Sequence, residues 1–375
     1  MIPFNKPSIT EKEIDNMMDC LKNSKICGDG TYTKLVNKWF EDKIDAEFLL
    51  TTSGTASLEM AALLCNLKPG DEVIVPSYTF VSTVNAFALR GAIPVFVDID
   101  PRTMNINANK IEEKITERTK AIFPIDYAGV VCDMDKIMEI AKKYNLIVVE
   151  DAAQAVGSYY KGKPAGTQAD YGCYSFHETK NYVMGEGGGI VVKSHDDYLN
   201  AEIIREKGTN RSQFMKGYVD KYTWHAIGSS YLPSDILAAL LYGQLERFDE
   251  IMDKRMRVWN KYHEFLKVYE EQGKVIRPYI PEYCQHNAHM YYMILPTAEE
   301  RDEMIQYLKE NGIMAPFHYI PLHLSPVGEK YGYKNGDLPY TEEYAARLIR
   351  LPLYADMKDE EIEKVCKVLK KKFGE

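Results

Sequence analysis

Lys180 stands in a stretch whose residue types suit amine chemistry. Residues 174–181 read YSFHETKN, and a glycine-rich segment follows at 185–189. A lysine amine attacks an aldehyde once burial or a neighbouring cation lowers its pKa enough to supply the neutral form. Ser175 offers a hydroxyl to a phosphate, and the glycines let a bulky ligand approach the backbone. The pattern indicates a lysine that reacts with pyridoxal 5'-phosphate (PLP). A solvated lysine in a polar loop is the alternative, and this stretch alone leaves it equally open.

Short apolar runs alternate with helical patterns from residue 47 onward, which places Lys180 in an α/β fold. The expected strands are residues 48–50, 72–75, 94–97, 121–123, 146–149, 172–176 and 189–193, and the expected helices between them are 56–67, 79–90 and 134–144. Brief β-branched strands separated by helices predict a mostly parallel sheet of about seven strands, covered on both faces.

Two further parts flank this sheet. Residues 1–45 hold a helical pattern at 10–21 and are expected to form an arm on the main domain. A long helical pattern from 236 toward 269 carries the predicted boundary, near Arg247, between a large domain (1–247) and a smaller C-terminal α+β domain (248–375). The smaller domain is expected to contain strands at 289–295 and 314–317 and helices at 299–311, 341–349 and 358–373.

The loops that follow the strands carry the other candidate site residues. Ligands of open α/β sheets sit beyond the carboxyl ends of the strands. After the first strand, hydroxyls and Gly54 open a helix whose N-terminus suits a phosphate, although Ser/Thr capping explains them equally well. Phe80 follows the second strand and could lie against a flat ring or pack in the core. Asp151 follows a buried strand and could hold the proton of a pyridine nitrogen or cap a helix. Together, the four loops favour a PLP site.

Composition excludes several other classes. The chain has 375 residues, with 45% apolar content and 46 Lys plus Arg against 55 Asp plus Glu, a formal net charge of -9. No basic run suggests a nucleic acid or an anionic membrane as partner. The start lacks a signal-peptide pattern, and no apolar run approaches the roughly 18 residues of a membrane span, so a cytosolic protein is expected. Seven cysteines without a C-x-x-C pair argue against a metal centre or disulfide framework.

These motifs resemble a known family. Residues 53–56, 76–80, 150–154 and 175–180 are similar to the corresponding segments of the DegT/DnrJ/EryC1/StrS family of PLP-dependent nucleotide-sugar aminotransferases. The resemblance implies the aspartate-aminotransferase fold (PLP fold type I), with Lys180 bound to the cofactor aldehyde, Asp151 at the pyridine nitrogen, Gln154 beside the ring and Phe80 stacked on it. It also implies a phosphate site, made by Gly54, Thr55, Ala56 and Ser175.

The resemblance further implies a homodimer with its sites at the subunit interface. Many family members supply an asparagine from the partner subunit in a Gly-x-Asn-Tyr-Arg loop. Here residues 228–232 read GSSYL, and Ser230 stands where that asparagine would be. A serine reaches less far than an asparagine, so the expected contact with the cofactor phosphate would be a shorter version of the family's contact.

Substrate expectations come from the same resemblance. Residues 1–5, 27–30, 177–182, 205–214 and 317–323 are similar to members that transfer the amino group of L-glutamate to C4 of dTDP-4-keto-6-deoxy-D-glucose, giving dTDP-4-amino-4,6-dideoxy-D-galactose and 2-oxoglutarate. Lys180 would carry the proton. The candidate substrate residues are Arg211, Lys221, Tyr222, Trp224, His318, Tyr319 and His323, with a mobile loop or a structural role as the alternative for each.

Three other functions remain on this fold. One is amination at C3 instead of C4, which the sequence does not separate. Another is a sugar dehydratase, which Lys180 disfavours because such relatives carry histidine there. The third is a non-catalytic regulator that binds a sugar nucleotide, and the retention of Lys180, Asp151 and the phosphate loop disfavours it.

Overall fold

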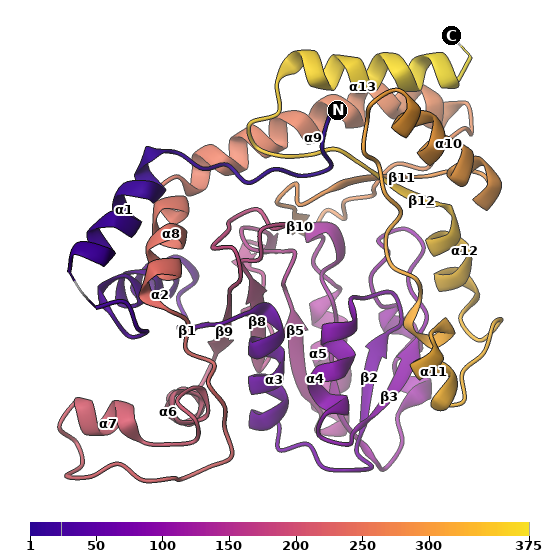
Figure 1. The fold of residues 1–375 in the computed structure, drawn as a ribbon. Helices are drawn as coiled ribbons and strands as arrows, with labels where there is room; N and C mark the ends of the chain where they lie inside the picture. Colours follow the sequence, from indigo (N-terminus) through magenta and orange to yellow (C-terminus); the bar gives the residue numbers. More distant parts are fainter. Residues whose placement is uncertain (24, 375) are drawn as a thin grey trace.

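A seven-stranded sheet forms the centre of the larger part of the molecule (Figure 1). The computed structural model describes residues 1–23 and 25–374. The strands of this sheet are β1 (Glu47–Thr51), β2 (Glu72–Pro76), β3 (Ile93–Val97), β4 (Thr119–Ile122), β5 (Ile147–Asp151), β8 (Tyr171–Ser175) and β9 (Gly188–Val192). They lie in the order β1-β9-β8-β5-β4-β2-β3. Strand β9 runs antiparallel to both neighbours and the other pairs are parallel, which confirms the predicted mostly parallel α/β sheet.

Helices cover both faces of this sheet. One face packs against α2 (Thr31–Ile44), α5 (Met134–Tyr144) and α8 (Asp235–Leu245), and the other against α3 (Gly54–Leu64), α4 (Val81–Ala88) and α6 (His195–Arg205). Strand β1 shows how the sequence divides between the two cores. Phe48 and Leu50 point into the first core and Leu49 into the second, as the alternation of side chains along a strand requires.

A smaller unit caps one end of the sheet, at the top of Figure 1. Its core lies among the long helix α9 (Phe248–Glu271), α10 (Ala298–Glu310), α13 (Asp359–Lys372) and the antiparallel pair of β11 (Tyr291–Ile294) and β12 (Leu348–Leu351). The remaining helices and strands are α1 (Glu11–Lys22), α7 (Arg211–Met215), α11 (Pro326–Lys330), α12 (Pro339–Arg347), β6 (Tyr159–Tyr160), β7 (Lys163–Pro164) and β10 (Cys284–Gln285). In the described part of the chain, no helix is both long enough and apolar enough to cross a membrane.

The structure differs from the sequence expectations mainly around the smaller unit. The long helix expected from 236 is two helices, because Arg247 leaves the helical conformation between α8 and α9. Residues 314–317 form no strand; instead the backbone N–H of Met314 donates to the carbonyl of Ile2. Ile2 also belongs to the core of the smaller unit, so the first residues of the arm pack there and not on the large sheet. The helix expected at 341–349 ends at Arg347 and continues as β12.

Candidate active site

A cavity of about 670 Å³ lies where the carboxyl ends of β1, β2, β5 and β8 meet the smaller unit. The loops after these four strands contribute Gly54, Phe80, Asp151 and Lys180 to its lining. The sequence therefore correctly predicted that these loops converge. The smaller unit and the N-terminal arm complete the walls, so both parts of the chain enclose one space.

Lys180 sits in a loop that the glycine-rich segment fixes. The backbone N–H of Glu178 donates to the carbonyl of Gly185 at 2.9 Å, and the N–H of Lys180 donates to the carbonyl of His177 at 2.9 Å. The side chain is largely removed from water, which lowers the pKa of its amine to about 8, with Asp151 opposing that shift and Arg350 adding to it. At pH 7 about a tenth of Lys180 is therefore neutral and nucleophilic, far more than for a lysine with the ordinary pKa.

Asp151 ends β5 and turns its carboxylate into the cavity. One carboxylate oxygen accepts a hydrogen bond from the hydroxyl of Thr83 at 2.7 Å, and the other accepts from the N–H of Ala153 at 3.2 Å. Burial raises the pKa of Asp151, whereas these hydrogen bonds and the charge of Lys180 lower it. A buried carboxylate held in this way can keep a proton on a ring nitrogen, because it gains from any cation placed beside it.

Gln154 connects the sheet to the smaller unit. Its carbonyl accepts from the N–H of Ala128 at 2.7 Å, and its amide donates to the hydroxyl of Tyr319 at 2.9 Å. Tyr319 has a φ of 24°, and its ring stacks on His318 at 3.6 Å between ring centroids. His318 in turn shares a 2.8 Å hydrogen bond with the hydroxyl of Tyr127, and burial holds its pKa well below the usual histidine value. His318 is therefore neutral at physiological pH.

The part of the cavity at the N-terminus of α3 has the chemistry of a phosphate site. Ser53 caps α3 by accepting the N–H of Ala56 at 3.0 Å, so that N–H is already engaged. Gly54, Thr55 and Ser175 line the cavity at this helix N-terminus. The hydroxyl of Thr55 lies 2.7 Å from that of Ser82. Free backbone N–H groups and hydroxyls at the positive end of a helix favour a phosphate dianion.

Gly54→Ala should weaken PLP binding, because a Cβ at position 54 would lie 2.9 Å from Cβ and 3.1 Å from Oγ of Ser175. Relieving this overlap costs about 1–3 kcal/mol and separates two elements of the phosphate site. The measurement is the PLP dissociation constant by absorbance titration, with thermal unfolding of the apoprotein as the control for stability. An unchanged dissociation constant would place the phosphate elsewhere.

Phe80 lies at the rim of this cavity. Its side chain is 57% exposed, and its ring centroid is 6.3 Å from that of Tyr319. An exposed aromatic ring beside a cavity is available to stack on a flat ligand, unlike the core phenylalanine that the sequence left as an alternative.

Several candidate substrate residues lie outside the cavity. His323 is fully buried, with Nδ1 2.7 Å from the hydroxyl of Ser77 and Nε2 2.9 Å from a carboxylate oxygen of Glu342. These contacts join the smaller unit to β2, which is the structural alternative considered from sequence. Arg211 forms an ion pair with Glu206 at 3.1 Å. The other candidate residues outside the cavity are Ala56, which is buried in α3, and Lys221, Tyr222, Trp224 and Ser230, all exposed in the segment between α7 and α8.

The sequence did not single out three groups that line the cavity. Arg350 comes from β12, and His289 comes from the segment before β11. The Nδ1 atom of His289 lies 3.0 Å from the side-chain oxygen of Asn181, the residue after Lys180. Asn5 of the N-terminal arm donates to the carbonyl of Glu178 at 3.0 Å. Arg350 and His289 have no recognisable local motif, because both reach the site through the packing of the smaller unit. Asn5 lies in the stretch 1–5 that resembles the family, but the resemblance gave it no role.

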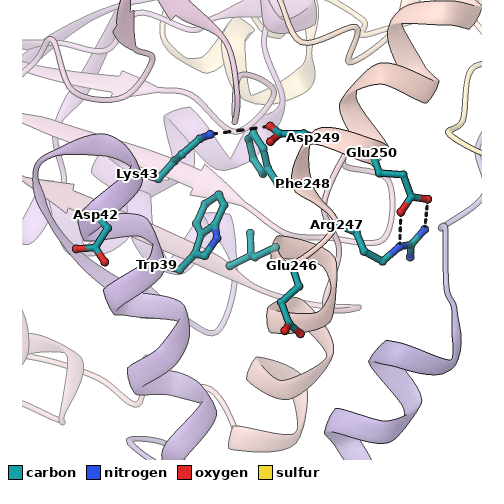
Figure 2. Close-up of a pocket in the computed structure, with 9 residues that line it drawn as sticks. Trp39, Asp42, Lys43, Glu246, Arg247, Phe248, Asp249 and Glu250 are labelled. Atoms are coloured by element: carbon teal, nitrogen blue, oxygen red, sulfur yellow. Dashed lines mark hydrogen bonds and ion pairs between the residues drawn. The ribbon is translucent and has the colours of Figure 1, made fainter.

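A second pocket of about 440 Å³ lies beside the junction of α8 and α9 (Figure 2). Four of its charged residues pair with one another: Lys43 with Asp249 at 4.0 Å and Arg247 with Glu250 at 3.0 Å. This pocket contains none of the candidate site residues that the sequence selected. The cavity around Lys180 is therefore the candidate active site.

The residues of that cavity fit PLP. A lysine with a pKa of about 8 would meet the aldehyde, a buried aspartate would meet the ring nitrogen, and a helix N-terminus with adjacent hydroxyls would meet the phosphate. A lysine, an aspartate and a phosphate cradle on an α/β sheet of this topology are the features of a PLP-dependent protein of fold type I. The chain also matches the sequence profile of the DegT/DnrJ/EryC1/StrS aminotransferase family over residues 7–370, and it belongs to that family.

The chain is similar to individual relatives over nearly its full length. The chain is 33% identical to a GDP-perosamine synthase of Escherichia coli O157:H7, covering 100% of this chain and 99% of that protein. Among solved structures, the chain superposes on the sugar aminotransferase Spr1654 of Streptococcus pneumoniae, in its pyridoxamine phosphate (PMP) form, with a TM-score of 0.92. The two are 29% identical, and the match covers 99% of this chain and 98% of the other. The aminotransferase TlmJ of Streptoalloteichus hindustanus gives 0.91 at 29% identity, covering 100% and 99%.

Proposed function

We propose that this aminotransferase transfers the amino group of L-glutamate to C4 of dTDP-4-keto-6-deoxy-D-glucose, giving dTDP-4-amino-4,6-dideoxy-D-galactose and 2-oxoglutarate. The observation that carries the transamination is the pair of Lys180, with a pKa of about 8, and buried Asp151 in one cavity. The similarity of residues 177–182, 205–214 and 317–323 to enzymes of that activity supports the choice of sugar. We place the enzyme in the cytosol as a homodimer.

Each group of the cavity then has a defined task. PLP, when bound, supplies an electron sink for the carbon that carries the amino group. Lys180 holds the cofactor and, once released, moves a proton to and from the reacting carbon. Asp151 holds the proton on the ring nitrogen. Neutral His318 and His289 line the same cavity without adding charge at physiological pH, since burial lowers the pKa of both.

The proposed homodimer gives the segment between α7 and α8 a role. Trp224 is 78% exposed there, and Tyr222 packs on Phe214 with 5.6 Å between ring centroids. These aromatic residues and Arg211 would meet the partner subunit or the nucleotide, and Ser230 would approach the phosphate of the partner's cofactor. Exposed aromatic side chains beside cations suit both tasks.

A GDP-linked 4-keto-6-deoxy sugar is the second candidate substrate. The relative that favours it is the GDP-perosamine synthase from E. coli O157:H7, at 33% identity over the whole chain. The two candidates, a dTDP-linked gluco sugar and a GDP-linked manno sugar, differ in the nucleotide and in the configuration at C2.

The absorption spectrum of the PLP-loaded protein separates these substrates. L-Glutamate should bleach the visible band, and dTDP-4-keto-6-deoxy-D-glucose should restore it. GDP-4-keto-6-deoxy-D-mannose, the second candidate substrate, is added to a parallel sample. If only the GDP sugar restored the band, the second candidate would replace the proposed substrate. An equatorial C4 amine in the NMR spectrum of the product would contradict the proposed galacto configuration. If glutamate failed to bleach the band, the assignment of L-glutamate as the amino donor would be wrong.

A further inference from the structure

Arg350 brings a positive charge into the cavity without an acidic partner. It lies in β12, and one terminal nitrogen of its guanidinium donates to the carbonyl of Phe317 at 3.0 Å. The guanidinium carbon stands 4.4 Å from the centre of the Phe4 ring. The Nε–H group is buried and has no hydrogen-bond partner. Among residues 1–23 and 25–374, no carboxylate forms an ion pair with Arg350.

The surroundings of Arg350 make this charge costly. Burial lowers the pKa of its guanidinium, and the groups that oppose this shift are the hydroxyls of Tyr127, Tyr319 and Tyr78, not a carboxylate. An arginine that lacks an anionic neighbour in a half-buried cavity is stabilised when an anion enters, because the charges then compensate each other. Its planar fork of N–H donors matches a carboxylate or phosphate in two-point contact.

The position of Arg350 favours a carboxylate close to the reacting carbon. Arg350 lines the same cavity as Lys180, His289 and His318, and its charge adds to the effect of burial in lowering the pKa of each. Lys180 must reach the carbon that gains or loses a proton. In an amino acid, the α-carboxylate is bonded to that carbon. In a 4-keto sugar nucleotide, the ring separates C4 from the diphosphate at C1.

We propose that Arg350 binds the α-carboxylate of the amino donor, and so selects an amino acid over a neutral amine. This inference rests on the proposed transamination and adds the residue that recognises one of its two substrates. The cofactor phosphate has separate donors, at the N-terminus of α3. The ring of Phe4 from the arm lies against the guanidinium, and the backbone carbonyl of Phe317 holds one of its terminal nitrogens.

Direct binding to the PLP-loaded protein tests the proposal without turnover. The variants are Arg350→Gln and Arg350→Lys, and the matched control is Arg257→Gln, a surface arginine paired with Asp359. Calorimetry with glutarate, a dicarboxylate that has no amine, measures the anion site, and calorimetry with dTDP measures the nucleotide site. Arg350→Gln should weaken glutarate about 10- to 150-fold, the loss expected for charged hydrogen bonds. The glutarate affinity of Arg350→Lys should lie between those of the wild type and Arg350→Gln. The dTDP affinity of both variants should stay within about twofold of the wild type.

The glutamate-induced bleaching of the PLP band gives a second readout. Arg350→Gln should raise the glutamate concentration needed for half bleaching by the same factor, and should lose the preference of the wild type for L-glutamate over its α-carboxamide. Equal glutarate binding in the wild type and Arg350→Gln would overturn the inference, as would a loss of dTDP binding instead. If glutarate binding depended on Arg350 but glutamate did not bleach the PLP band, the anion site would be supported. The proposed amino donor would then be overturned.

Discussion

Lys180→Ala should lower turnover by about 10⁴-fold, the upper end for loss of a positioned proton-transfer group. The variant loses both the amine that holds PLP and the carrier of the proton. The pKa of about 8 makes Lys180 suited to both tasks, because the neutral and protonated forms are both populated near neutral pH. The measurement is single-turnover kinetics with glutamate, together with the visible spectrum, which should lack the band of lysine-bound PLP.

Lys193→Ala is the matched control, since that exposed lysine donates only to the carbonyl of Gln168. Added methylamine should restore part of the activity of Lys180→Ala, because a small amine can replace a missing proton carrier but cannot repair a folding defect. In the wild type, the rate at which the apoprotein takes up PLP should increase with pH through about 8, as Lys180 loses its proton. Near-normal turnover in Lys180→Ala would contradict the assignment.

The sequence predicted the large sheet well because each of its strands is marked by a short run of neighbouring residues. Runs such as 72–75 carry β-branched residues and end at turns, and α5 occupies Met134–Tyr144 as expected from its periodicity. The sequence could also place Asp151 and Lys180 in one site, because the carboxyl ends of parallel strands lie at the same edge of the sheet.

The residues contributed by the smaller unit could not be placed in this way. Arg350 follows a segment with helical periodicity, and only pairing with β11 makes residues 348–351 a strand. His318 and His323 are close in sequence, yet one lines the cavity and the other joins Ser77 to Glu342. The difference arises from the 3-10 turn at Leu322–Leu324 and its packing on β2, which no local pattern encodes.

Asp151→Asn should lower turnover by about 150- to 5,000-fold while leaving the apoprotein at least as stable as the wild type. Removing one partner of a buried charge pair costs about 3–5 kcal/mol, and each 1.36 kcal/mol changes a rate tenfold. Asparagine has nearly the same shape and can still accept from Thr83, but it cannot balance a protonated ring nitrogen. The measurements are kcat, the PLP dissociation constant and the Tm of the apoprotein.

The expected stability follows from the direction of the pKa shift. Burial raises the pKa of Asp151 above its unfolded value, so the folded apoprotein disfavours the carboxylate. Above that raised pKa, ionised Asp151 costs folding free energy, and asparagine removes this cost. Asp98→Asn is the matched control, because buried Asp98 accepts the N–H and hydroxyl of Thr341 at 2.8 Å and should lose stability while keeping turnover. If Asp151→Asn instead destabilised the apoprotein and left kcat within about tenfold of the wild type, the carboxylate would serve the fold and another group would hold the ring proton.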